Sequence, residues 1–66
     1  MIVFTERLKK FIDLFPNRGI FCDKIGYSEP ELSKIINEKR DVPRNMIEAL
    51  HKYTGWELND LIEVES

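Results

Sequence analysis

The sequence predicts an all-α domain, a compact bundle of about five short helices, and three observations favour this fold class. Apolar residues recur at helical spacing in successive stretches, each with a polar opposite face. Residues that cap helices, together with single glycines, separate these stretches at short intervals. The chain has 66 residues, of which 42% are hydrophobic, so there is room for one core. We therefore expect a single domain over residues 1–66.

The first helix is expected between Thr5 and Phe15. Apolar residues at helical spacing provide its core side: Leu8, Phe11, Ile12 and Phe15. Thr5 can cap its amino-terminal end. The helix should end at Phe15, because a residue before proline avoids the α region and Pro16 follows.

The second helix is expected to start at Asn17, a good N-cap residue. Its core side is formed by Ile20, Phe21, Cys22 and Ile25. Gly19 in the first turn weakens the helix by about 1 kcal/mol relative to alanine. Cys22 is the only cysteine, which excludes an internal disulfide and a cysteine-based metal site, and we expect it to be a small buried residue.

The third helix follows a turn at Gly26 and has the clearest start signal. Ser28 can accept a hydrogen bond from the Glu31 N–H while the Glu31 carboxylate reaches back to Ser28, a capping box. Pro30 fits the first turn, where its missing N–H is not needed. The apolar stripe consists of Leu32, Ile35 and Ile36. The opposite polar face is also what a helix that recognises a partner would present, but this stretch alone favours a solvated surface helix.

The fourth helix should begin at Arg44 or Asn45 and end at Gly55, a natural C-terminal cap. Its apolar positions are Met46, Ile47, Leu50 and Tyr53. A last apolar turn or helix contains Trp56, Leu58, Leu61 and Ile62. His51 is the only histidine and has no second metal-ligating residue nearby, so we expect a structural or exposed side chain and no metal site.

The charges are unevenly distributed along the chain. The net charge is −2, but residues 1–44 hold nine Lys and Arg against seven Asp and Glu, and residues 45–66 hold one against five. Cations gather around the end of the third helix: Lys34, Lys39, Arg40 and Arg44. This excess suggests a polyanionic partner on that side, whereas the alternative is a mixed surface that serves only solubility. No apolar run approaches the length of a membrane span or a signal peptide, so we expect a cytoplasmic protein without a membrane partner.

An enzyme is not expected. No nucleophile and base, paired carboxylates or glycine-rich phosphate loop can be identified, and so short a chain rarely encloses a pocket. We expect no catalytic residue and no cofactor. Binding is the more natural function for such a domain.

The stretch from about Arg18 to Ile62 resembles the helix-turn-helix family of phage lambda-type repressors and Cro proteins, the XRE-like family. The positions that match the core motif are Phe21, Cys22, Gly26, Tyr27, Ser28, Leu32, Ser33, Lys34 and Ile35. Pro43 matches the proline before the family's fourth helix. The segment 55–62 resembles its closing Gly-Val-Ser-x-Asp-x-Leu-Leu. The resemblance implies a lambda repressor-like fold and sequence-specific binding of double-stranded DNA by a transcriptional regulator of repressor type, from a phage or prokaryote.

The resemblance also implies roles for individual residues. Those that would face base edges in the major groove are Glu29, Pro30, Ser33 and Lys34. Those that would contact phosphates or the minor groove are Arg18, Asn37, Lys39, Arg40 and Arg44. Lys34 could donate to guanine, and Glu29 could accept from the cytosine amino group. The phosphate contacts would give affinity and salt dependence.

A homodimer is the expected assembly. The carboxyl-terminal end carries more apolar side chains than one short helix can bury: Trp56, Leu58, Leu61, Ile62 and Val64. We expect the dimer interface there, with Met1 to Phe4 as the second choice. The alternative function is a helix-turn-helix fold that binds protein, as an antirepressor, an antitoxin-like partner or an inhibitor. The acidic carboxyl-terminal third and Glu29 favour this alternative.

Overall fold

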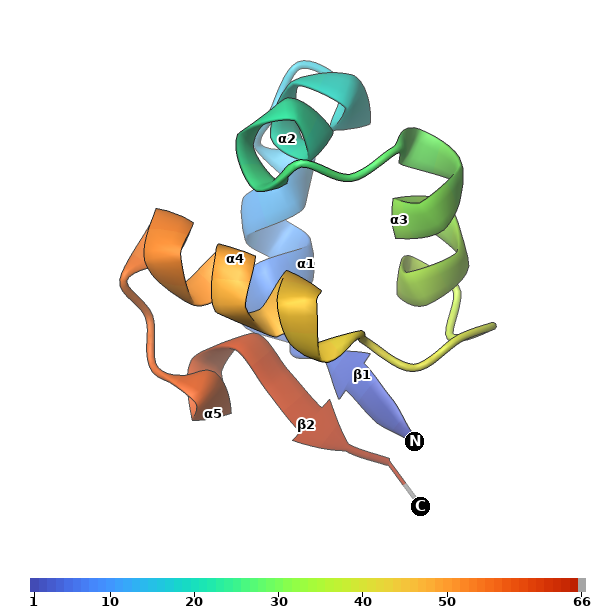
Figure 1. The fold of residues 1–66 in the computed structure, drawn as a ribbon, viewed down its shortest axis with the longest axis vertical. Coiled ribbons are helices and arrows are strands. Elements are labelled where there is room, and N and C mark those ends of the chain that lie inside the picture. Colours follow the sequence, from blue (N-terminus) through green and yellow to red (C-terminus); the bar gives the residue numbers. More distant parts are fainter. Residues whose placement is uncertain (66) are drawn as a thin grey trace.

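The computed structural model describes residues 1–65 as five helices and a small two-stranded sheet (Figure 1). The helices are α1 (Glu6–Asp13), α2 (Arg18–Ile25), α3 (Glu29–Ile36), α4 (Arg44–Thr54) and α5 (Leu58–Leu61). The strands are β1 (Ile2–Phe4) and β2 (Ile62–Val64). The Cα radius of gyration of 10.7 Å is close to the value of about 11 Å that a compact chain of this length should have. The prediction of a compact domain with five helices is confirmed.

The all-α prediction is wrong in one respect, because the two ends of the chain form a sheet. β1 pairs antiparallel with β2, with Ile2 opposite Val64 and Phe4 opposite Ile62. The Met1 ammonium donates to the Glu65 carbonyl oxygen at 2.7 Å, so the termini lie together (Figure 1). Each end is too short and too rich in β-branched residues for a helix, and pairing satisfies its backbone groups.

Every element except β2 contributes at least one buried side chain to the core. Its largest fully buried members are Phe4, Leu8, Ile12, Phe21, Leu32, Ile35, Met46, Leu50 and Leu61. Cys22 is 2% exposed, which confirms it as a packed residue. The half-buried ring of Phe11 extends the core between α1, α2 and α4, since its centroid lies 6.3 Å from that of Phe21 and 6.5 Å from that of Tyr53.

The helix ends follow the predicted capping residues closely. Thr5 accepts from the Leu8 N–H and Asn17 from the Ile20 N–H, at 3.2 and 3.0 Å. Gly55 ends α4 in the left-handed conformation, at φ 72°. α1 ends at Asp13 rather than Phe15, because Leu14 and Phe15 donate instead to the carbonyls of Phe11 and Ile12, three residues back.

Candidate nucleic-acid interface

The chain passes from α2 to α3 through a tight turn at Gly26. Gly26 adopts the left-handed conformation, with φ 77°, which glycine reaches at little cost. The N–H groups of Gly26 and Tyr27 both donate to the Cys22 carbonyl, at 2.8 and 3.1 Å. The turn therefore holds α3 beside α2, and Leu32 and Ile35 on the inner side of α3 are fully buried.

Ser28 caps α3 as the sequence predicts, but only half of the capping box is formed. The Ser28 hydroxyl accepts from the Glu31 N–H at 3.5 Å, a long hydrogen bond. Within residues 1–65, no hydrogen bond joins the Glu31 carboxylate to the Ser28 N–H. Pro30 lies in the first turn of the helix, where its missing N–H leaves no gap in the hydrogen bonding.

The outer side of α3 carries the residues predicted to face bases. Pro30 and Lys34 are exposed, whereas Ser33 is half-buried. The Arg18 guanidinium reaches across from α2 and donates to the Ser33 hydroxyl at 3.5 Å. The structure thus brings together one residue predicted to contact phosphate and one predicted to contact bases. Lys34 projects from the last turn of a helix whose opposite side is fixed in the core.

Glu29 differs from its neighbours, because its carboxylate lies against the first turn of α2. A Cβ atom added to Gly19 would lie 3.5 Å from Glu29 Cδ and 3.6 Å from Glu29 Oε2. These are ordinary van der Waals distances, so the Glu29 side chain lies directly beside the Gly19 backbone. The carboxylate is also near the positive end of the α2 dipole, a favourable place for a negative charge. A phosphate that approached Arg18 would meet this carboxylate.

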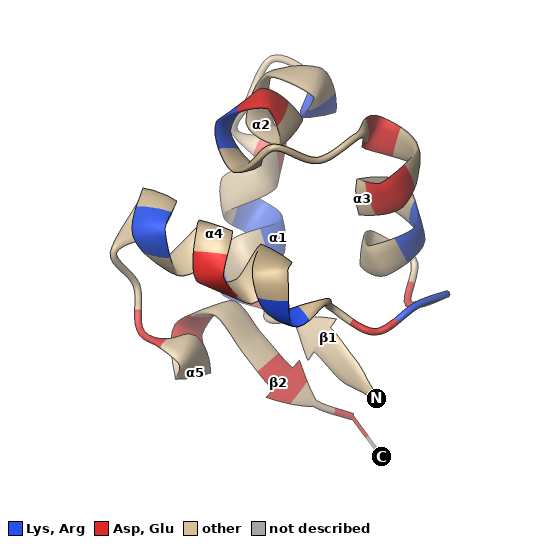
Figure 2. Ribbon diagram, in the orientation of Figure 1, with Lys and Arg blue, Asp and Glu red and all other residues tan. Residues whose placement is uncertain are grey.

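The predicted cations follow one another from the last turn of α3 to the start of α4, with the acidic residues Glu38 and Asp41 between them (Figure 2). Lys34 lies in the last turn of α3, Lys39 and Arg40 in the following loop, and Arg44 at the start of α4, and all are exposed. The Arg44 side chain is 90% exposed, and its Nε atom lies 3.5 Å from a Glu48 carboxylate oxygen. Such an exposed pair contributes little and leaves the guanidinium accessible. Two carboxylates in the first turn of α3, Glu29 and Glu31, lie at the other end of this surface.

The loop that carries Lys39 and Arg40 is anchored at both ends. Asn37 is the exposed C-cap residue of α3. Next to it, Glu38 adopts a left-handed conformation with φ 59°, which allows the Lys39 N–H to donate to the Lys34 carbonyl at 2.8 Å. At the far end the Asp41 carboxylate accepts from the Ile2 N–H at 2.8 Å. The cations are therefore presented on an ordered turn that is tied to β1.

Glu38 itself is held by charge contacts that the sequence did not indicate. Its carboxylate lies 3.5 Å from the Lys9 ammonium of α1. A hydrogen bond to Glu38 and the negative charge of Glu38 raise the pKa of Glu65 above its ordinary value. The sequence indicates only the unusual backbone at this position, since glutamate stands where glycine usually ends a helix.

The residues predicted for a dimer interface separate into two groups. Leu61 is 0% exposed, so its side chain is part of the core and cannot contact a second chain. Trp56 is half-buried, with its ring centroid 5.2 Å from that of Phe11. In contrast, Leu58 is 52% and Val64 81% exposed, and Ile62 is half-buried. Of the second-choice segment, Val3 and Phe4 are each 1% exposed and packed inside.

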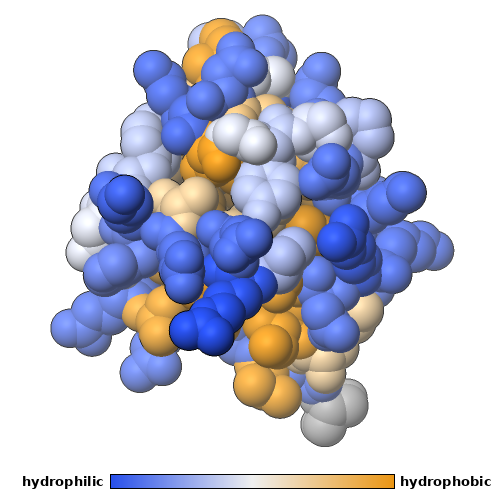
Figure 3. All heavy atoms as spheres, in the orientation of Figure 1, coloured by the Kyte–Doolittle hydropathy of each residue, from blue (hydrophilic) through white to orange (hydrophobic). Residues whose placement is uncertain are grey.

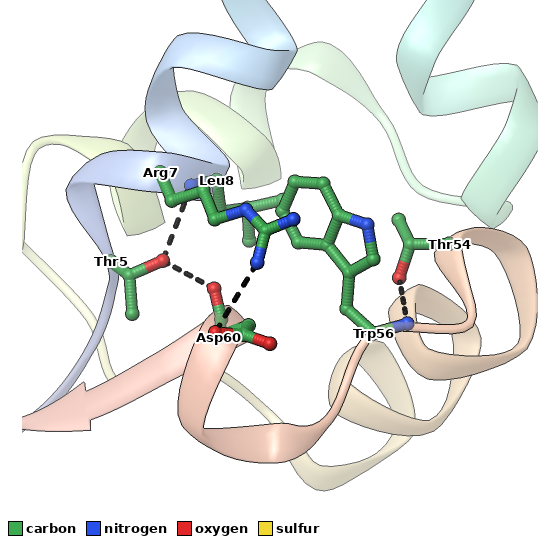
Figure 4. A network of polar contacts seen from close by, with 6 residues as sticks. All are labelled: Thr5, Arg7, Leu8, Thr54, Trp56 and Asp60. Atoms are coloured by element: carbon green, nitrogen blue, oxygen red, sulfur yellow. Dashed lines mark hydrogen bonds and ion pairs between the residues drawn. The ribbon is translucent and has the colours of Figure 1, made fainter.

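A network of contacts between α1 and the segment around α5 accounts for the half-buried position of Trp56 (Figure 4). The Arg7 guanidinium carbon lies 4.2 Å from the Trp56 ring centroid, a cation–π contact, and Arg7 is 3.3 Å from the Asp60 carboxylate. The Thr5 hydroxyl donates to the Asp60 carbonyl at 2.6 Å. These contacts join residues far apart in the chain, so spacing along the sequence could not reveal them.

His51 is exposed, as expected, and Nδ1 lies 2.7 Å from the Trp56 carbonyl oxygen. Since a carbonyl can only accept, Nδ1 carries the proton of this bond. In the part of the chain that the structure describes, no three His, Cys, Asp or Glu side chains are placed to hold a metal ion. None of the helices within residues 1–65 is both long and apolar enough to cross a bilayer.

Comparisons with known proteins give no relative for this chain. No protein-family model matches it, and no curated protein or solved structure does so either.

Proposed function

We propose that this chain is a helix-turn-helix domain that binds double-stranded DNA in a sequence-specific manner, as a transcriptional regulator of phage or prokaryotic type. The surface of α3 supports this proposal most strongly. It presents exposed Pro30 and Lys34 on a helix whose other side is buried, and the exposed cations Lys39, Arg40 and Arg44 follow directly. A rigid helix flanked by cations is what insertion into a major groove requires.

In this proposal α3 enters the major groove, and Lys34 provides the direct readout. Its ammonium can donate to the O6 and N7 acceptors of guanine. Ser33 is oriented by Arg18, which also reaches the DNA backbone. Lys39, Arg40 and Arg44 hold phosphates and contribute affinity for any sequence. Glu29 opposes phosphate binding near α2, so it limits affinity.

The proposal is tested by selecting bound sites from random duplexes and measuring affinity against salt concentration. We expect Lys34→Ala to weaken binding to the selected site by about 1–3 kcal/mol and to relax the preference at one base pair. Arg40→Ala should weaken binding to every sequence alike and reduce the slope of log K against log salt by about 1. Glu29→Gln should tighten binding.

Lys52→Ala is the matched control, since Lys52 is also an exposed lysine but lies in the last turn of α4, away from the cation series. The affinity of the Lys52→Ala variant for DNA should equal that of the wild type. The proposal is wrong if no duplex is retained at low salt, or if Lys52→Ala weakens binding as much as Lys34→Ala does.

A second candidate function is a protein-binding module, and the acidic carboxyl-terminal end favours it. Glu57, Glu63 and Glu65 are all exposed there, and Glu29 adds negative charge beside α2. A basic protein would be the matching partner. Co-purification with such a protein, together with an absence of salt-dependent DNA binding, would support this function over the first.

A further inference from the structure

The two-stranded sheet has one covered edge and one free edge. On the outer side of β1, Ile2 donates to the Asp41 carboxylate at 2.8 Å and accepts from the Val42 N–H at 3.1 Å. On the outer side of β2, the Val64 N–H and C=O point away from β1, and within residues 1–65 no hydrogen bond reaches them. Val64 is also 81% exposed. A sheet edge with free backbone groups is a template for pairing with another strand.

An apolar groove of about 580 Å³ adjoins β2, between α4 and the segment of α5 and β2. Its apolar lining comes from Ile47, Leu58 and Ile62. Figure 3 shows apolar side chains in the lower part of the molecule, where Figure 1 places α5 and the sheet. Ile62 belongs to β2, and a residue paired with it in a neighbouring strand directs its side chain to the same face. A strand added to β2 would therefore place an apolar side chain beside the groove.

The unpaired charges beside the free edge and the groove are negative. The ionisable residues that line the groove are Arg44, Glu48, His51 and Glu57. Arg44 and Glu48 form an ion pair at 3.5 Å, so their charges offset each other. Glu57 and Glu63 are exposed and have no ion-pair partner within residues 1–65, and Glu63 lies on the opposite face of β2 from Val64. A cationic partner would match these carboxylates.

We propose that the outer edge of β2 receives an extended segment of a partner protein as a third strand, and that basic and apolar residues alternate in this segment. Its apolar side chains lie beside Ile62 and Val64 and reach the groove, while its basic side chains face Glu63 on the other side of the sheet. Backbone hydrogen bonds along the edge give affinity, and the alternating side chains give specificity.

A second copy of the chain is a poor occupant of this edge. If its β2 paired through Val64, Glu63 would lie opposite Glu63 or Glu65 of that copy. Like charges directly opposite each other destabilise a sheet. The inference goes beyond DNA binding, since α3 takes no part in it, and it gives the second candidate function a surface and a class of partner.

The test uses the whole chain without DNA and a short synthetic peptide of alternating lysine and valine. Calorimetric titration should show binding at least about tenfold tighter than that of a peptide of alternating glutamate and valine, which Glu57 and Glu63 repel. A peptide with the same lysines and valines in separate blocks should also bind at least about tenfold more weakly, because it cannot divide them between the two faces of a strand.

Hydrogen exchange shows whether the peptide pairs with the edge. In the complex the Val64 N–H should exchange with solvent at least about tenfold more slowly, because it becomes hydrogen-bonded. The Glu63 N–H points toward β1, where it is already paired, so it is the internal control and its exchange should not change.

Two substitutions at Val64 isolate the backbone contribution. Val64→Pro removes the outward N–H without breaking the pairing with β1, and it should weaken binding of the lysine–valine peptide at least about tenfold. Val64→Thr is the matched control, because it keeps both the N–H and a β-branched side chain, and it should bind within about threefold of the wild type. Glu63→Lys should weaken binding of the lysine–valine peptide and strengthen binding of the glutamate–valine peptide. Thermal unfolding monitored by circular dichroism verifies that each variant is folded.

Four results would overturn the inference. These are a wild type that does not bind the lysine–valine peptide, an unprotected Val64 N–H in the complex, equal binding by Val64→Pro and Val64→Thr, and a wild-type dimer that Val64→Pro abolishes, since a second copy then occupies the edge. A basic protein that binds Val64→Pro as tightly as the wild type refutes this inference and leaves the second candidate function standing. A chain that binds the peptide as expected but no DNA refutes only the DNA-binding proposal.

Discussion

Replacing Glu38 with glycine should stabilise the domain, although glycine usually weakens a folded chain. Glu38 is the non-glycine residue with positive φ in the described part of the chain, at 59°. In this conformation Cβ crowds the following carbonyl oxygen, which costs an L-residue about 1–2 kcal/mol. Glycine has no Cβ and avoids this cost, but it loses about 0.5–1 kcal/mol more conformational entropy on folding than alanine does.

The comparison that isolates the backbone effect is Glu38→Gly against Glu38→Ala. Both variants remove the same carboxylate, which attracts Lys9 at 3.5 Å and opposes the ionisation of Glu65, so the charge effects cancel. The net difference should be about 1 kcal/mol in favour of glycine. In a domain of this size it corresponds to a melting temperature about 4–8 °C higher.

Urea denaturation and thermal unfolding, both followed by circular dichroism, measure the difference. Glu38→Gln reports the charge contribution separately, because it keeps the strained backbone and removes only the charge. We expect its free energy of unfolding to lie within about 1 kcal/mol of the wild type, since the pair with Lys9 is partly exposed. The reasoning is refuted if Glu38→Gly is no more stable than Glu38→Ala.

Three further predictions concern the turn and the core. Gly26→Ala should lower the free energy of unfolding by about 1 kcal/mol, the left-handed strain less the entropy that alanine saves, because an added Cβ has no atom within 4 Å. Denaturation in urea measures this change. Leu61→Ala should cost about 2–5 kcal/mol in the same assay, whereas Leu58→Ala, at a half-exposed position, should cost less than about 1 kcal/mol. Burial, followed by the nearby carboxylates of Glu29 and Asp23, raises the pKa of the Cys22 thiol. The folded state therefore holds the thiol proton more tightly than the unfolded state does. The contribution of Cys22 to the free energy of unfolding should be complete below the ordinary thiol pKa of about 8.5 and should decrease as pH rises above it. Cys22→Ala should abolish this decrease.

The helix ends could be predicted from the sequence because the interactions that form them are local. Thr5, Asn17 and Ser28 each accept a hydrogen bond from an N–H only three residues further on. Gly55 ends α4 through its own conformational freedom. A capping residue and its partner lie within one turn of each other in the sequence, so residue type and spacing identify them.

The candidate site was predictable only in part. Periodicity placed Lys34 on the outer side of α3, and the structure shows it exposed. Periodicity could not place Glu29 against Gly19, because that contact depends on the packing of α3 beside α2. Leu58 is exposed and Leu61 is buried, and this difference also depends on which side of α5 meets α1.

The sequence by itself determined the number of helices, the caps at Thr5, Asn17, Ser28 and Gly55, the burial of Cys22 and the polar outer side of α3, since these follow from residue types and spacings within about one or two turns. Only the tertiary structure decided that the chain ends form a sheet, that Arg7 covers Trp56, and that Leu58 and Ile62 line a groove with α4. These features join segments that are distant in the sequence. Their formation depends on which apolar surfaces meet when the core forms. The spacing of residues within one segment does not contain this information.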